Sequence, residues 1–431
     1  MAWLKRRTSW IRLQSFLTVL LCTILFSPPA ADAECSLSRW QPAETRPYRG
    51  VAFPERNAQY WIFRFVNEPE AHLKLNLKAR FPHARYMAYT LYSLEDDESE
   101  GFPVTVNGRI QHLEDVKIEP REGHANPYLD GADRKADDRS YEIHLIQEKI
   151  EDLQPGDEPP PNTLVMPSGK QDLALFLRIY LPDDADDPKG GVALPTITAL
   201  DEESGAELPC PAAAEGAVTA EDILFSGGFD RAGILLPENT INTYRPGEFS
   251  FFSNGDCPYL TTPLIHPFLN SGLVAVLRFK APSFPDTRAG DSFSEDDEVR
   301  YFSVCIGDWQ LTTSSECISD EALKVDENGY VNLLVGPDIL LPPKTKWNNL
   351  RWGWHADPVL IFRQISPRQT FENSFARAEI AFDESSGVVN LHDLVENEPD
   401  KIASDDIGDY APIGKYCTVK NFLYNRCEYI R

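Results

Sequence analysis

The chain lacks the short motifs that mark most metal, redox and hydrolytic sites. It has no Cys-x-x-Cys pair, no histidines spaced as His-x-His, His-x-x-x-His or His-Glu-x-x-His, and no Gly-x-Ser-x-Gly sequence. The absence of these spacings removes the support for a structural zinc ribbon, a thiol oxidoreductase motif or the nucleophile elbow of an α/β hydrolase.

Basic residues are also scarce. The chain has 41 Lys and Arg against 67 Asp and Glu, a net charge of −26. Nucleic acid is not an expected partner, because its binding depends on cations that neutralise phosphates. Acidic clusters at 95–100, 183–187 and 294–298 stand among Pro, Gly and Ser, as solvated loops do. We expect no cofactor and no metal; Ca²⁺ held by these carboxylates is the alternative, although none has the spacing of an EF-hand loop.

No long apolar run occurs after the N-terminal region. Residues 16–26 (FLTVLLCTILF) follow several basic residues, and a small-residue site at 31–33 comes soon after. A bilayer-spanning helix needs about 20 apolar residues, so this shorter run indicates a signal peptide cleaved after Ala33. We therefore expect a periplasmic or secreted protein with no membrane span left after cleavage. An uncleaved anchor and a lipid attached to Cys35 are the alternatives.

The cysteines after residue 33 agree with export to an oxidising compartment. Two local pairs each close a short loop that contains polar turn residues, and we predict a disulfide in each. Of the remaining three cysteines, one must stay unpaired unless it bonds to a second chain. The predicted pairs are Cys305–Cys317 and Cys417–Cys427, and the other three are Cys35, Cys210 and Cys257.

Short alternating runs separated by turn residues predict an all-β fold. The 34 prolines and 25 glycines divide the chain into runs such as AHLKLNLKARF from residue 71, in which leucines alternate with polar residues. We expect two tandem antiparallel β-sandwich domains, jelly-roll-like, with few short helices. The predicted parts are a signal peptide (1–33), a first sandwich (34–205), a linker region (206–250) and a second sandwich with a Cys-containing tail (251–431). One longer helix is predicted over 368–381.

The two halves repeat one order of features, which predicts an internal duplication. Each half has a strand ending near Phe-Pro (81–82 and 284–285), an Arg-Tyr pair opening the next strand (85–86 and 300–301), and a later strand led by tyrosine (141 and 330). An apolar strand with one arginine follows in each half, carrying Arg178 or Arg363. If the halves share one fold, Arg178 should superimpose on Arg363, and Tyr86 on Tyr301.

The segment NTLVMPSGKQDLALFLRIYLPDD (162–184), with RYMAYTLYS before it and GGVALPTI after it, carries a family resemblance. It is similar to the C-terminal β-sandwich of bacterial exported proteins grouped as domain-of-unknown-function families 1254 and 1214. Leu177, Arg178, Tyr180 and Pro182 match the LRxYxP-like signature of that family, whereas the second half has Ile365 where the tyrosine would stand. The resemblance implies a β-sandwich and no activity, because that family has no agreed function.

Candidate ligand-binding residues come from the strand arginines and from a tryptophan-rich loop. A buried guanidinium needs a partner, which is either a group within the fold or an anionic or sugar ligand. The loop KWNNLRWGWHADP (346–358) has more Trp than a turn requires, and rings beside amides suit sugars or aromatic ligands; an aromatic plug closing the sandwich is the alternative. The predicted ligand-binding residues are Trp347, Trp352, Trp354, His355, Arg178 and Arg363.

These features favour a binding or structural module outside the cytoplasm, with a small molecule or glycan as its unidentified ligand. The alternative is an envelope hydrolase with a carboxylate pair or a His-carboxylate site in a cleft between the domains. Histidines at 83, 112, 124 and 144 supply candidate imidazoles, but the acidic residues are too numerous for any pair to stand out. No catalytic residue is assigned.

Overall fold

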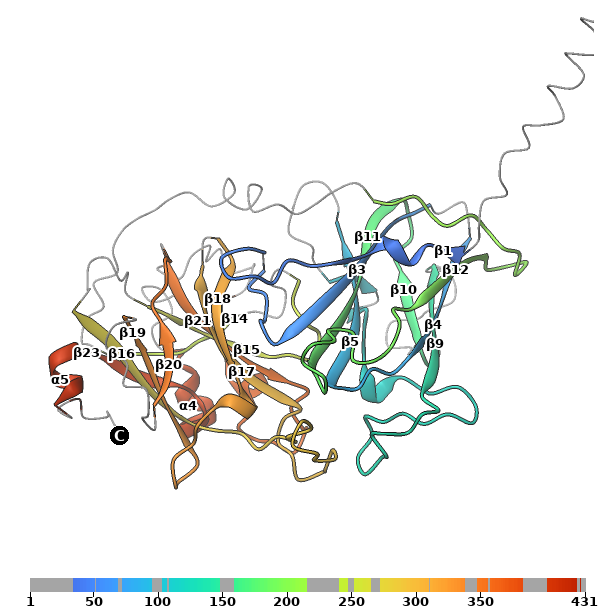
Figure 1. Cartoon of the computed structure of the whole chain (residues 1–431). Helices are drawn as coiled ribbons and strands as arrows, with labels where there is room; N and C mark the ends of the chain where they lie inside the picture. Colours follow the sequence, from blue (N-terminus) through green and yellow to red (C-terminus); the bar gives the residue numbers. More distant parts are fainter. Residues whose placement is uncertain are drawn as a thin grey trace, which may run out of the picture.

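The computed structural model describes residues 34–424 and 427, except residues 51, 69–71, 95–102, 107, 148–158, 215–239, 247–251, 265–271, 310, 338–346, 356 and 383–400. Within this part of the chain the fold is all-β, as predicted. The alternating pattern explains the strands: the leucines of residues 73–77 are buried, and the polar residues between them reach solvent. Figure 1 shows two groups of strands, one from the first half of the chain (blue to green) and one from the second (yellow to red).

The elements divide between the two halves, with short helical turns in both. The first half contains β1 (Glu34–Cys35), β2 (Trp40–Pro42), β3 (Ala58–Asn67), β4 (Leu73–Arg80), β5 (Ala84–Ser93), β6 (Thr105–Val106), β7 (Arg109–Ile110), β8 (His112–Glu114), β9 (Ser140–Gln147), β10 (Thr163–Met166), β11 (Gln171–Pro182) and β12 (Thr196–Asp201). The second half contains β13 (Thr240–Ile241), β14 (Arg245–Pro246), β15 (Tyr259–Pro263), β16 (Leu273–Lys280), β17 (Tyr301–Asp308), β18 (Thr313–Ser319), β19 (Tyr330–Gly336), β20 (Asn348–Arg351), β21 (Pro358–Ile365), β22 (Ile380–Phe382) and β23 (Ile413–Thr418). The helical turns are η1 (Leu37–Arg39), η3 (Asp115–Lys117), η5 (Asp320–Ala322), η6 (Phe375–Arg377), α4 (Ala403–Ile407), η8 (Gly408–Tyr410) and α5 (Val419–Leu423).

Each half is a sandwich of two sheets around its own core. In the first half the sheets have the orders β1-β12-β4-β9-β10 and β2-β3-β11-β5-β8, and side chains from both, such as Leu75 and Phe63, form one cluster. In the second half the orders are β13-β23-β16-β19-β20 and β15-β21-β17-β18, again with a shared cluster that includes Leu277 and Phe362. Most neighbouring strands are antiparallel, with a parallel pair at one edge of each sandwich, β9–β10 and β19–β20.

The two halves repeat one strand order and one register. Strands β3, β4, β5, β8, β9, β10, β11 and β12 occupy the places taken by β15, β16, β17, β18, β19, β20, β21 and β23. Arg178 of β11 lies opposite Tyr60 of β3, and Arg363 of β21 lies opposite Tyr259 of β15. Tyr86 and Tyr301 pair with the residues two places after Arg178 and Arg363, respectively. The two arginines therefore hold equivalent positions, while descent from a duplicated gene stays a prediction.

Backbone bends recur at matching places as well. Phe53 and Phe252, before β3 and β15, have φ of 48° and 45°, and Leu181 and Ser366, three residues after the strand arginines, have φ of 43° and 44°. Such conformations cost non-glycine residues on the order of 1 kcal/mol each, so they persist only where the surroundings fix them. Leu181 and Ser366 each donate their N–H to a carbonyl in the segment that precedes β3 or β15.

The prediction of a helix over 368–381 is wrong. That segment forms successive three-residue turns, the short η6 and then β22. Arg245 donates to the carbonyl oxygens of Ala376 and Ala378, and Phe371 and Phe375 are buried in the second core. These tertiary contacts take carbonyls that a helix would use and outweigh the helix propensity of the segment.

The predicted disulfides Cys305–Cys317 and Cys417–Cys427 are confirmed. A third bond joins Cys35 to Cys210 and leaves Cys257 as a buried free thiol. This bond ties a residue of the predicted linker region to the first sandwich. The predicted signal peptide and the acidic cluster at 95–100 lie outside the described residues. Among the residues that the structure describes, no helix is long and apolar enough to cross a membrane.

Candidate functional site at the junction of the two halves

Where the two halves meet, each half extends a short segment, called an arm below, that contacts the other half. The first arm (residues 48–57, with residue 51 outside the described part) precedes β3 but contacts the second half: Phe53 donates its N–H to the Thr312 carbonyl, and Tyr48 to that of Ser314. The second arm (residues 252–258) precedes β15 and contacts the first half, where Tyr92 donates to the Ser253 carbonyl at 2.7 Å. The polar groups buried at the junction therefore come from both halves.

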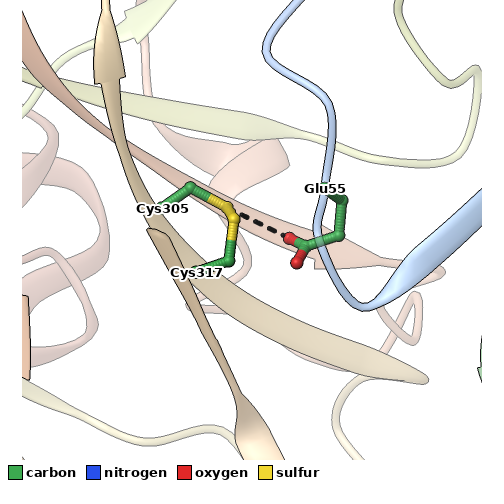
Figure 2. A group of neighbouring side chains, drawn as sticks. All are labelled: Glu55, Cys305 and Cys317. Atoms are coloured by element: carbon green, nitrogen blue, oxygen red, sulfur yellow. Dashed lines mark hydrogen bonds between the residues drawn. A yellow bond between two sulfur atoms is a disulfide. The ribbon is translucent and has the colours of Figure 1, made fainter. Parts of the chain in front are cut away.

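The arm of the first half carries a carboxylate into the second. Glu55 is 0 % exposed, and its Oε2 accepts a hydrogen bond from Ser303 at 2.5 Å and lies 3.4 Å from Nη1 of Arg363. Figure 2 shows Glu55 pointing toward the Cys305–Cys317 disulfide. Its Oε2 lies 3.3 Å from Cys305 Sγ. Arg363 also donates to the carbonyl of Phe53. Its guanidinium thus joins the arm to β21 and β17.

Glu55, Cys305 and Cys317 are the one group in the described ranges whose potential ligand atoms cluster closely enough for a metal ion. The residues do not fit one, because the sulfurs are joined in a disulfide and are not thiolates, the form that binds metals. Arg363 also places a positive charge 2.9 Å from Cys305 Sγ. In the acidic loop at 183–187, Asp184 and Asp187 accept N–H groups of their own turn, so part of their oxygen capacity is already used.

The equivalent cluster of side chains in the first half has different chemistry around Arg178. Its Nη1 donates to Thr90 Oγ1 at 2.8 Å, and its Nη2 donates to the Phe252 carbonyl at 2.7 Å, as Arg363 does to Phe53. Thr90 and His112 face each other across β5 and β8 at the register positions that Cys305 and Cys317 hold in the other half. A hydrogen bond of 2.9 Å between Thr90 Oγ1 and His112 Nδ1 takes the place of the disulfide.

Asp256 of the second arm is the centre of that cluster. It accepts hydrogen bonds from Tyr86 and Ser366, both at 2.7 Å, and its Oδ1 lies 3.4 Å from His112 Nε2. Burial pushes the pKa of Asp256 upward, but His112, Ser366 and Tyr86 outweigh burial and hold the pKa below its ordinary range. Gly255 covers the imidazole so closely that an added Cβ would lie 2.8 Å from the ring. The cluster is engaged within the protein, which favours a structural role.

Two arginines reach across the junction in opposite directions. Arg85 of the first half donates to Asp320 Oδ1 at 2.5 Å, and Nη2 of Arg300, in the second half, lies 4.0 Å from Asp115 Oδ1. Each aspartate also accepts an N–H from the inner strand of its own half. Burial raises the pKa of Asp115 to about 7 and that of Asp320 to about 6, with the arginines opposing the rise.

The raised pKa values of Asp115 and Asp320 predict that the protein loses stability as the pH rises toward neutral. Because folding raises their pKa values, the stabilisation is complete below the ordinary Asp pKa of about 4 and is lost as the pH rises through 6 to 7. We expect the melting temperature to fall between about pH 4.5 and 7.5, and Asp115→Asn to flatten that fall. Circular dichroism melts across this range measure it.

Asp326→Asn is the matched control for the pH prediction. Hydrogen bonds from Tyr330, Asn328 and Arg278 outweigh burial and lower the pKa of Asp326 to about 2, so its contribution changes only in more acidic solution. Its melting curve should keep the wild-type slope above about pH 4.5. If Asp115→Asn and the wild type run parallel over the whole range, the buried carboxyls do not control this behaviour.

The residues predicted to bind ligand do not converge on one place. Arg178 and Arg363 are buried at the junction, with 2 % and 3 % exposure. Trp352 packs in the second core and donates Nε1–H to the Leu273 carbonyl. Trp347 packs on Phe422 of α5. Trp354, in contrast, is 79 % exposed.

Two exposed aromatic residues, Trp354 and Tyr48, lie where the first arm meets the tryptophan-rich loop, and together they are called the aromatic surface below. Trp354 donates its N–H to Tyr48 Oη at 3.3 Å, and the Tyr48 ring lies 5.3 Å from the ring of His355. His355 is buried, shares a hydrogen bond of 2.8 Å with Ser315, and burial lowers its pKa to about 4, so it is neutral at pH 7. Gly353 has φ of 67°, and a Cβ there would lie 2.6 Å from Tyr48 Oη. The loop is therefore fitted closely to the arm.

Sequence reasoning missed the partners that the arms supply. Glu55, Asp256 and Tyr48 lie far in sequence from the residues they contact, and no local pattern distinguishes them from other polar residues in loops. The histidines also have separate roles: His124 accepts the N–H of Ser140, and His144 shares a hydrogen bond with Asn76. The one signal available was the repeat itself, because Phe53 and Phe252 stand at similar distances before β3 and β15.

Two solved structures are similar to the chain at low identity. An uncharacterised protein from Burkholderia cenocepacia is 13% identical over 95% of this chain and 89% of its own, with a TM-score of 0.49. The VPA0106 protein from Vibrio parahaemolyticus is 11% identical over 74% of this chain and 86% of its own, with a TM-score of 0.36. No family model and no curated protein matches the chain.

Proposed function

We propose that the protein is an exported binding module that takes a neutral glycan on the aromatic surface of Tyr48 and Trp354. The exposure of Trp354 carries the proposal: the residue is 79 % exposed, while its backbone N–H donates to the Tyr48 hydroxyl and so ties the loop to the first arm. Trp is highly buried on average in folded proteins, and its amphipathic ring is well suited to contacts with a partner, so an exposed Trp beside a second exposed aromatic residue is a candidate binding position.

The surroundings of the aromatic surface favour a sugar over other ligands. Planar rings pack against the apolar face of a sugar, while the Tyr48 hydroxyl and nearby backbone groups can meet its hydroxyls. Trp354 and Tyr48 come from segments that hydrogen-bond to each other, so little ordering is needed on binding. The net charge of −26 disfavours anionic polysaccharides and nucleic acids.

The test is native gel electrophoresis of the full chain in gels containing dextran, laminarin or xylan. We expect at least one of these neutral glycans to retard the wild type, and Trp354→Ala to weaken the retardation at least about tenfold, because truncation removes the stacked ring. Tyr424→Ala is the matched control, since Tyr424 is a 65 % exposed aromatic residue beyond α5. No retardation by any of them, or equal losses in both variants, would overturn the proposal.

A further inference from the structure

The Cys305–Cys317 disulfide joins strands that are already held together. Cys305 and Cys317 are directly opposite each other in the antiparallel pair β17–β18 and only 12 residues apart in sequence. The first half shows that the fold does not require a covalent bond at this position, because Thr90 and His112 occupy it with a hydrogen bond. Because the fold does not need this bond, we consider a role for the disulfide in thiol chemistry.

The two cysteines differ in exposure and in electrostatic surroundings. Cys305 is 0 % exposed, whereas Cys317 is half-buried on β18, the last strand of its sheet. An incoming thiolate attacks the sulfur it can reach and expels the other as a thiolate, faster when that thiolate is stabilised. Here the expelled sulfur would be Cys305, with Arg363 Nη1 at 2.9 Å. A cation at this distance favours a thiolate.

We propose that Cys305–Cys317 is a thiol-exchange site, at which a dithiol partner bonds to Cys317 and displaces Cys305. The partner's first thiolate forms a sulfur–sulfur bond with Cys317 Sγ, the Cys305–Cys317 bond breaks, and Cys305 leaves as a thiolate beside Arg363. The partner's second thiolate then attacks its own sulfur in the mixed disulfide and releases Cys317. Two electrons pass to this chain, which becomes a dithiol, and the partner becomes a disulfide.

Glu55 opposes this step and sets its rate. Its Oε2 lies 3.3 Å from Cys305 Sγ and 3.4 Å from Arg363 Nη1, so the carboxylate competes with the departing thiolate for the same cation. Glu55→Gln keeps the shape of the side chain and removes the competing charge. Reduction of this disulfide should therefore be faster in the variant than in the wild type.

Cys35–Cys210 is the internal comparison. Cys210 is the more exposed residue of this pair and Cys35 is 3 % exposed, so attack at Cys210 would expel Cys35. The nearby cation, Arg39, lies 2.9 Å from Cys210 Sγ, beside the attacked sulfur instead of the departing one. Like the proposed site, this disulfide joins a buried cysteine to a more exposed one. It differs because its arginine is not beside the sulfur that would leave.

The experiment follows reduction of the native, oxidised full chain by dithiothreitol, with timed acid quenching, alkylation and peptide mass spectrometry. We expect Cys305–Cys317 to open at least about tenfold faster than Cys35–Cys210, and Glu55→Gln to increase that rate severalfold. With glutathione in place of dithiothreitol, the wild type should carry the adduct on Cys317. Slower opening than Cys35–Cys210, or an adduct on Cys305, would refute the site, and the glutathione result needs no variant to fold.

Discussion

Replacing Arg363 with methionine should lower the free energy of unfolding by about 3–5 kcal/mol, because Glu55 would remain buried without its cation. Both residues are almost completely enclosed, with exposures of 3 % for Arg363 and 0 % for Glu55. The variant also leaves the Phe53 carbonyl without the donor that fixes the first arm. Urea denaturation followed by fluorescence measures the loss.

A second substitution shows how much of the lost stability comes from the unpaired charge of Glu55 and how much from the lost packing of Arg363. Adding Glu55→Gln to Arg363→Met removes the stranded carboxylate, so the double variant should recover part of the lost stability. Arg351→Met is the matched control, because Arg351 pairs with Glu316 while its side chain is 58 % exposed, and it should cost no more than about 1 kcal/mol. If Arg363→Met and Arg351→Met lower the free energy of unfolding equally, the buried pair of Arg363 and Glu55 is no more important for stability than an exposed pair.

Trp352→Ala should cost about 3–5 kcal/mol, because it removes a large side chain from the second core and leaves a cavity. The side chain is 8 % exposed and packs within the cluster formed by both sheets of that half. The change also leaves the Leu273 carbonyl without the indole donor. Thermal unfolding of the purified variant is the measurement.

Trp354→Ala is the control two residues away in the same loop. Because its indole is mostly in solvent, the substitution should change stability by less than about 0.5 kcal/mol. The two tryptophans would thus separate a core contribution from a binding contribution within one short segment. A large loss in Trp354→Ala, or a negligible one in Trp352→Ala, would show that the loop packs differently.

The strand pattern was sufficient to predict the fold class, because alternation of apolar and polar residues has one explanation in a half-buried strand. The two local disulfides were predictable for a similar reason, since each closes a short loop. The segment 368–381 was not, because its helix propensity is overruled by Arg245, which lies more than a hundred positions earlier and takes its carbonyls. Nothing local encodes that contact.

The candidate site was harder to predict than the fold. Arg178 and Arg363 were correctly identified as buried guanidiniums that need partners, but their partners come from arms of the opposite half. Composition could not show which tryptophan of the loop is buried and which is exposed. Trp352 and Trp354 lie on either side of Gly353, and the direction of the chain there decides which ring enters the core. Burial depends on such long-range geometry, which periodicity does not describe.

The exchange of arms limits how this protein can move. Many two-domain proteins trap a ligand by hinge closure about a flexible boundary. Here each strand arginine donates to a carbonyl that the opposite half contributes, so swinging the halves apart would take one acceptor from each of two buried guanidiniums at once. The glycan proposed above would therefore meet a surface whose shape is already fixed before it binds.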